Sequence, residues 1–328
     1  LQRTQEGHEV ISGALDWHGE GALAWLPRSP FHARNRPAPA EWTGRFTLLL
    51  ASPAGSGVDA PGGDGWAAVT IAPSGLVKVA GKLADGTALT ESASLSALGE
   101  IALFKQLYRS LPLKGHVGGW LRFHDIPSVS DFHGRLHWLK HPDTRDRQYP
   151  AGFDTVRGTL GSRFTAPPAG TRLLAELADA DPNASLNLFG PNLPPTSGQE
   201  IERVISWQRG NTLRHFGPEA LTAASSSATG LVSGSYRDPA TGLLLPFQGV
   251  VLQKQGLAAG FYLLGSGSGA MRVKPGTAFP YPGSEFAGPQ RRAGKPLDPA
   301  APAAASHLPF EPAAAGTYHG VVQDSTMN

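Results

Sequence analysis

The stretch Leu76-Val-Lys-Val-Ala-Gly-Lys-Leu83, with Asp85-Gly86 and a returning segment from Thr87 to Leu95, decides the fold class. Its apolar and polar residues alternate, which places successive side chains on opposite faces of a half-buried strand. The Asp-Gly pair predicts a type I′ hairpin turn, because both central residues of that turn need positive φ. The stretch therefore predicts an antiparallel hairpin with one face on a core.

Further segments of the same kind flank this hairpin at short intervals. They are separated by clusters of Gly, Pro, Asp and Ser, which punctuate strands. Glycines inside several of them fit a sheet that bends. This spacing predicts a closed or nearly closed antiparallel barrel, in which the strands leave no long free edge. The segments are residues 42–50, 66–71, 118–123 and 132–138.

A second and shorter set of strands is expected within residues 220–275, at 230–236, 247–253 and 259–265. The piece from Leu76 to Thr87 resembles the piece from Leu231 to Gly242, since each is a strand that runs into a turn beginning with Asp. We interpret this as a weak internal repeat. The fold class is all-β, with antiparallel β-barrel modules that are two related barrels or two halves of one, and with extended N- and C-terminal arms.

These patterns divide the chain into five parts. Residues 173–180 and 200–209 are the only segments with the pattern of short helices. The last part is rich in Pro, Ala and Gly and has no apolar periodicity, so it needs a surface to order it, either its own barrel or a partner subunit. The parts are an N-terminal arm (1–40) with a strand at 10–17, a first β-barrel-like region (41–168), a connector with short helices (169–219), a second β region (220–275) and a Pro/Ala-rich C-terminal arm (276–328).

Composition excludes several functional classes. The chain of 328 residues has no cysteine, which rules out disulfides, thiolate metal sites and a cysteine nucleophile. Charged residues make up 16% and the net charge is +2, without the basic stripe of a nucleic-acid-binding protein. We expect no nucleic-acid partner. No apolar run is long enough for a helix that spans a membrane.

The order of several motifs resembles the exported β-barrel-like C-terminal module of large secreted proteins of Verrucomicrobia, planctomycetes and related bacteria. The residues that carry the resemblance lie at 77–87, 118–121, 134–140, 149–153, 161–164, 238–242, 246–255 and 259–265. The resemblance covers about residues 42–275 and implies export to the periplasm, the outer membrane surface or the extracellular space. It also implies an all-β fold, and no catalytic residue is carried over from it. The two arms and the histidines at 133, 137 and 141 depart from the family pattern.

Five of the eleven histidines lie between residues 116 and 141. If 132–138 is a strand, residues 133, 137 and 141 share one face, and a hairpin would bring His124 close to His133. Imidazole pairs with a nearby carboxylate suit zinc, copper or iron. The candidate metal ligands are His124, His133 and His137. The alternatives are that these side chains line the solvent face, with Phe132, Leu136 and Trp138 in the core, or that they form a subunit contact.

No set of residues has a pattern typical of a catalytic site. Asp143, Asp146 and Asp154 lie among three arginines, Arg145, Arg147 and Arg157, and this composition favours charge balance on a surface. Trp66, Trp120 and Trp138 lie in strand patterns, where core packing is the usual reason for tryptophan.

We therefore expect a non-catalytic structural or accessory subunit of an exported or envelope-associated assembly. Its arms dock on other protein subunits, and it needs no cofactor. The alternative is a ligand-binding module for a glycan or a metal ion.

Overall fold

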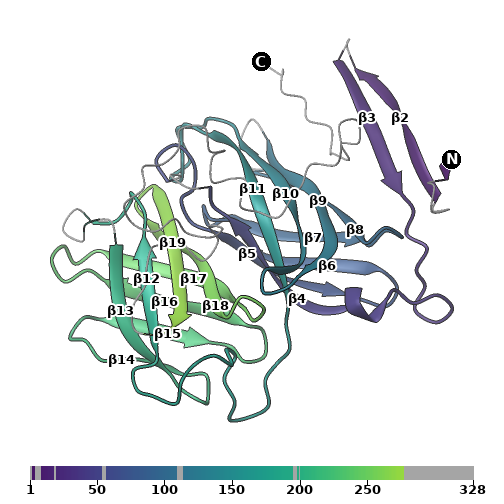
Figure 1. Ribbon diagram of the computed structural model, residues 1–328. Helices are drawn as coiled ribbons and strands as arrows, with labels where there is room; N and C mark the ends of the chain where they lie inside the picture. Colours follow the sequence, from purple (N-terminus) through teal and green to yellow (C-terminus); the bar gives the residue numbers. More distant parts are fainter. Residues whose placement is uncertain are drawn as a thin grey trace, which may run out of the picture.

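The structure is a computed structural model that describes residues 2–3, 9–17, 20–53, 57–108, 114–194, 198 and 200–276. This part of the chain is almost entirely β, with one 3₁₀ helix at Ala40–Trp42. Two eight-stranded antiparallel sheets curl into barrels that stand side by side (Figure 1). The all-β prediction is confirmed, and the alternative of two barrels holds over that of two halves of one. The expected C-terminal arm at 276–328 lies outside the described residues, apart from Gly276.

Barrel 1 is an up-and-down meander in which consecutive strands pair, except β7 and β8, which are the two edges of the sheet. The last strand, β11, pairs with the first, β4, and an isolated bridge between Leu95 and Ile101 brings β7 to β8. This arrangement nearly closes the barrel. Its strands are β4 (Gly44–Ala51), β5 (Gly65–Ile71), β6 (Leu76–Lys82), β7 (Ala88–Ser94), β8 (Glu100–Leu107), β9 (Gly115–Ile126), β10 (Ser130–Lys140) and β11 (Phe153–Arg163).

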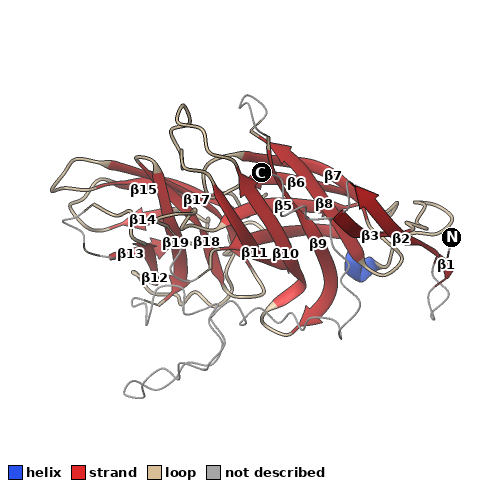
Figure 2. Cartoon of the chain, turned by 90° about the horizontal axis from the view of Figure 1, so that it is seen from above, coloured by secondary structure: helices blue, strands red, loops and turns tan. Residues whose placement is uncertain are grey.

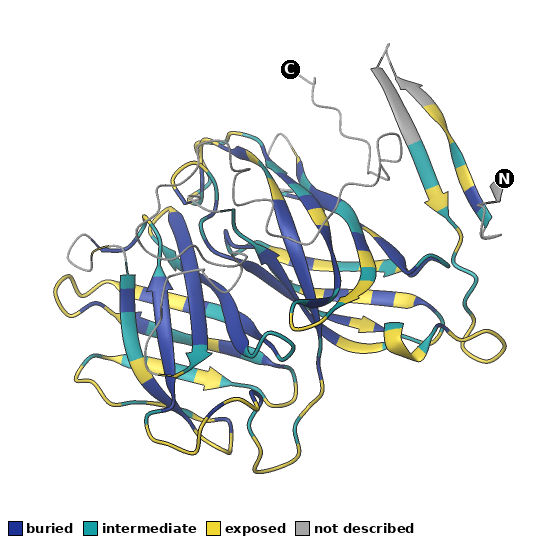
Figure 3. Ribbon diagram, viewed as in Figure 1, coloured by how far each residue is buried: buried dark blue, intermediate teal, exposed yellow. Residues whose placement is uncertain are grey.

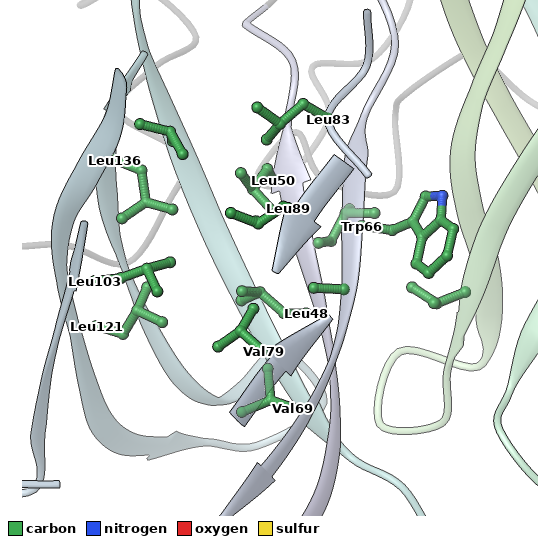
Figure 4. Packing of buried hydrophobic residues seen from close by; sticks show 14 of the residues in the cluster. Leu48, Leu50, Trp66, Val69, Val79, Leu83, Leu89, Leu103, Leu121 and Leu136 are labelled. Carbon is green, nitrogen blue, oxygen red and sulfur yellow. The ribbon is translucent and has the colours of Figure 1, made fainter. Parts of the chain in front are cut away.

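The interior of barrel 1 is filled by aliphatic side chains from opposite walls. Figure 4 shows Leu48, Leu50, Val69 and Val79 lying across from leucines of β8, β9 and β10, whereas Trp66 turns away toward barrel 2. Because β6 has solvent on its outer face, its burial alternates as the sequence pattern predicts. Barrel 1 therefore has a packed core instead of an open channel.

Aromatic residues close one end of barrel 1. The ring of Trp42 stacks on that of Phe123 with centroids 5.9 Å apart, and Phe31 meets Trp42 edge-on at 6.5 Å. Phe46 and Phe132 continue this cluster into the core, 5.4 Å apart. Edge-to-face and stacked pairs of this kind add to the free energy gained from burial.

Barrel 2 repeats the same meander. β12 pairs with the last strand, β19, and a bridge between Thr212 and Ala224 brings β14 to β15. Its strands are β12 (Ala184–Phe189), β13 (Glu200–Trp207), β14 (Leu213–His215), β15 (Leu221–Ser225), β16 (Leu231–Arg237), β17 (Leu244–Leu252), β18 (Leu257–Leu264) and β19 (Gly267–Pro275). Its interior holds a second hydrophobic cluster, with Trp207, Tyr236 and Met271 fully buried.

The two barrels share a wall, which we define as strands β4, β5 and β11 of barrel 1 with β17 and β18 of barrel 2. Val250, Leu252 and Phe261 belong to the same hydrophobic cluster as the core of barrel 1. The hydroxyl of Thr47 donates a hydrogen bond to the carbonyl of Val251 at 2.7 Å. In this wall, β18 is buried on both faces from Leu257 to Tyr262, and β17 from Gly249 to Leu252. The neighbouring strand β19 is also dark blue along most of its length in Figure 3.

The N-terminal segment forms a three-stranded ribbon of β1 (Gln2–Arg3), β2 (Glu9–Trp17) and β3 (Glu20–Pro27). The strand expected at 10–17 is present, but the next residues, expected to be an extended arm, form β3. The ribbon projects from the side of barrel 1 that lies away from barrel 2 (Figures 1 and 2).

Several expectations about the middle of the chain are wrong. Residues 200–207 form the strand β13 instead of a helix, and residues 173–180 contain only turns and bends. Isoleucine and valine at 201, 204 and 205 suit a strand, and pairing with β12 fixes that conformation. Three strands of barrel 2 lie within 169–219, the expected connector, and the second barrel extends over 184–275 instead of 220–275.

Two details of the repeat also need correction. Gly86 has a φ of 87°, but Asp85 is not among the residues with positive φ, so the turn after β6 is not type I′. The carboxylate of Asp85 accepts a hydrogen bond from the Thr87 N–H instead. The segments that looked repeated contain the third strand of barrel 1 and the fifth strand of barrel 2, so they are not equivalent in the shared topology.

Candidate functional site

The outer face of β9, β10 and β11 carries the clustered histidines. Along β10, Phe132, Leu136 and Trp138 point into barrel 1 and are fully buried, as expected. His133 and His137 therefore lie on the opposite, outward face. Strand pairing places His116 of β9 opposite Leu139, and Asp154 of β11 opposite the same leucine from the other side.

His137 joins His116 and Asp154 into one polar chain, which we call the histidine chain. The Nδ1 atom of His137 lies 3.1 Å from Nε2 of His116, and its Nε2 atom lies 2.5 Å from Oδ1 of Asp154. The ring of Phe104 stacks on that of His116, with centroids 5.6 Å apart and planes 27° apart. Burial, together with the nearby charge of His137, lowers the pKa of His116. In the histidine chain, the lowered pKa of His116 disfavours its charged form, and the carboxylate of Asp154 orients the ring of His137.

The three predicted metal ligands are not brought together. The rings of His124 and His133 lie close, with centroids 5.5 Å apart, but His137 is committed to His116 and Asp154. In the part of the chain that the structure describes, no group of three or more His, Asp or Glu side chains is placed to hold a metal ion. Sequence spacing missed His116 and Asp154 as partners of His137, because only the register across three strands brings them together.

A buried ionic cluster lies where the two barrels meet. Asp64, just before β5, forms an ion pair with Arg272 of β19, and both side chains are at least 96% buried. Arg157 of β11 donates a hydrogen bond from Nη2 to the carbonyl of Pro61 at 2.5 Å. Burial raises the pKa of Asp64, and the guanidinium of Arg272 opposes that rise. Burial likewise lowers the pKa of Arg157 to about 10, which leaves it charged at neutral pH.

This position of Arg157 corrects the expectation that it balances charges on a surface loop. Its side chain faces into barrel 1, with the guanidinium carbon 5.4 Å from the centre of the Trp138 ring. Of the other residues in that loop, Asp143 pairs with Arg145, and Asp146 pairs with the buried Lys140. Trp66 and Trp138 pack in the core as expected, whereas Trp120 lies half-buried on the outward face.

Polar side chains extend the ionic cluster across the end of both barrels. The hydroxyl of Tyr149 accepts a hydrogen bond from the Ser268 N–H at 2.8 Å. Asn192 donates hydrogen bonds to the carbonyls of Ser268, at 2.9 Å, and Gly57, at 2.5 Å. These contacts join loops of the two barrels and cover this end of barrel 1. The arrangement connects structural elements and positions no nucleophile beside a general base.

A shallow pocket of about 340 Å³ lies on barrel 2. Asp179 bridges two arginines there, accepting a hydrogen bond from Arg172 at 2.6 Å and another from Arg209. Hydrogen bonds from Arg209 and Arg172 lower the pKa of Asp179. The charges of this pocket therefore neutralise one another, and a charged ligand would have to break these pairs.

The fold and these sites define a double β-barrel protein with a histidine chain on its outer face. No protein-family model, curated protein or solved structure matches this chain. Among the described residues, no helix is both long and apolar enough to cross a membrane.

Proposed function

We propose that this chain is a non-catalytic structural subunit of an exported or envelope-associated protein assembly, in which the double barrel is the rigid body and the N-terminal ribbon is the docking element. The observation that carries the proposal is the apolar surface of the ribbon. Ile11 and Leu26 are opposite each other in the β2–β3 register and are 53% and 57% exposed. Two neighbouring aliphatic side chains in solvent mark a surface that gains free energy when a partner covers it.

The position of β3 at the outer side of the ribbon supports the same proposal. β3 is the outer strand of the ribbon, and among the described strands it pairs with β2 alone. A ribbon of two long strands is only marginally stable alone in water. A strand added by a partner protein would pair with β3 and bury Ile11 and Leu26, as in β-augmentation. The expected partner is a sheet of another subunit. The family resemblance is the support for export.

Site-specific cross-linking of the chain within its native assembly tests this proposal. A photoreactive residue at position 11 or 26 is expected to give one discrete adduct with another subunit. The same residue at Val204, an exposed aliphatic position of barrel 2 that is 37% accessible, serves as the matched control and gives none. Native mass spectrometry of the purified assembly then gives the mass of the complex. The proposal is overturned if native mass spectrometry gives the mass of the single chain and neither ribbon position gives an adduct.

A further inference from the structure

We propose that the histidine chain binds one divalent transition-metal ion, with Nε2 of His116 and Nδ1 of His137 as its protein ligands and with water completing the coordination. This site differs from the three histidines predicted from spacing. It is also independent of the docking role of the ribbon, which lies on other strands.

The first support is the direction of the two nitrogen atoms. Asp154 accepts a hydrogen bond at Nε2 of His137, so the neutral ring carries its proton there and its lone pair at Nδ1. That lone pair points to Nε2 of His116, 3.1 Å away. Two nitrogens that face each other this closely share either a proton or a cation.

The second support is the separation of these nitrogens. Metal–imidazole bonds of about 2.0–2.1 Å in a tetrahedral ion place two ligand nitrogens about 3.4 Å apart. The observed 3.1 Å is close to that separation, and to admit the ion each ring must also tilt so that its lone pair points at an ion lying beside the line between the two nitrogens. His124 and His133 form a second pair of neighbouring rings, with centroids 5.5 Å apart, and the exposed His124 serves as a control.

The third support is the surroundings of the pair. A carboxylate that holds the far nitrogen of a ligating histidine is the usual outer-shell arrangement of protein metal sites. Asp154 occupies that position for His137, and the stacked ring of Phe104 restrains His116. Both imidazoles are only partly buried, so water can reach the remaining coordination positions.

The chemistry of the ligands indicates which ion fits. Imidazole nitrogen suits Cu²⁺, Ni²⁺ and Zn²⁺ better than Mg²⁺ or Ca²⁺, which prefer oxygen. With two protein ligands, the site is weaker than a structural site with four. The Irving–Williams order then predicts that Cu²⁺ binds more tightly than Zn²⁺.

The test is calorimetric titration of the full metal-free chain with Cu²⁺ and with Zn²⁺ in a non-chelating buffer at pH 7.5. The wild type is expected to bind one equivalent, and His116→Gln and His137→Gln each abolish that binding. Asp154→Asn weakens it about tenfold, at the lower end of outer-shell effects. His124→Gln, an exposed neighbour, leaves it unchanged.

Electron paramagnetic resonance of the Cu²⁺ complex gives an independent readout, with hyperfine structure from two nitrogens in the wild type and no signal from protein-bound Cu²⁺ in either single variant. Thermal unfolding without metal checks that every variant folds. Binding that survives both His116→Gln and His137→Gln, or a wild type that binds no equivalent, overturns the proposal. Loss of binding in His124→Gln overturns the assignment to this pair.

Discussion

The strands on the two sides of barrel 1 differ in their burial pattern, because one side faces solvent and the other faces barrel 2. Strand β6 faces solvent and alternates in burial, whereas β4, in the shared wall, has a continuous run of buried residues from Phe46 to Leu50. Barrel 2 shows the same contrast between β16 and β18. The wall between the barrels is therefore a second core, built from side chains that in a lone barrel would face water.

Several charged groups where the two barrels meet form ion pairs. Asp64 and Arg272 neutralise each other, and Lys254, in the turn before β18, forms ion pairs with Asp125 and Asp131 of barrel 1. A buried pair adds specificity more than net stability, because desolvation offsets much of the attraction. Because residues of both barrels share one hydrophobic cluster, we expect the two barrels to unfold together.

The largest expected effect comes from the apolar part of the shared wall. Phe261→Ala removes a fully buried ring and is expected to destabilise the protein by about 3–5 kcal/mol. It should also split denaturant unfolding into two transitions, because the ring joins barrel 2 to the core of barrel 1. Phe132→Ala, the matched control in the free wall, costs a similar free energy but leaves a single transition. Two transitions in both variants, or in neither, contradict the picture of a shared core.

A smaller effect is expected from the buried ion pair. Asp64→Ala leaves Arg272 as an uncompensated buried charge and is expected to cost about 3 kcal/mol in urea unfolding. The double variant Asp64→Ala with Arg272→Met removes both charges and should recover most of that loss. If the double variant is less stable than Asp64→Ala alone, the attraction is not the reason for the single-variant cost.

The smallest effect tests close backbone contact in the wall away from barrel 2. A Cβ atom on Gly134 of β10 would lie 1.9 Å from the carbonyl oxygen of Trp120, so Gly134→Ala forces the strands apart. The expected cost is about 1–3 kcal/mol, measured as a lower thermal midpoint. Gly13→Ala, at a strand position with no atom within 4 Å of the added Cβ, does not lower the midpoint. Equal losses in both variants would mean that strand propensity, and not crowding, sets the effect.

The sequence indicated six of the eight strands of barrel 1, which are β4 to β7, β9 and β10, but in barrel 2 it indicated only β16, β17 and β18. The prediction failed for β13, where Glu200–Trp207 read as a helix, since a short segment of mixed apolar and charged residues fits either period. The grouping of the candidate metal ligands differs from the contacts in the structure for another reason. His124, His133 and His137 were grouped by spacing along two strands, while the pairing of β9, β10 and β11 determined which side chains meet.

The sequence by itself determined that this protein is built from strands, that its cores are aliphatic and aromatic, and that no thiol chemistry is available to it, since these properties follow from local residue patterns and composition. The tertiary structure alone decided that there are two barrels with a common wall, that Arg157 is buried, and that His116, His137 and Asp154 form one chain. These are contacts between residues far apart in the sequence, and strand register, which fixes them, depends on the packing of the whole sheet.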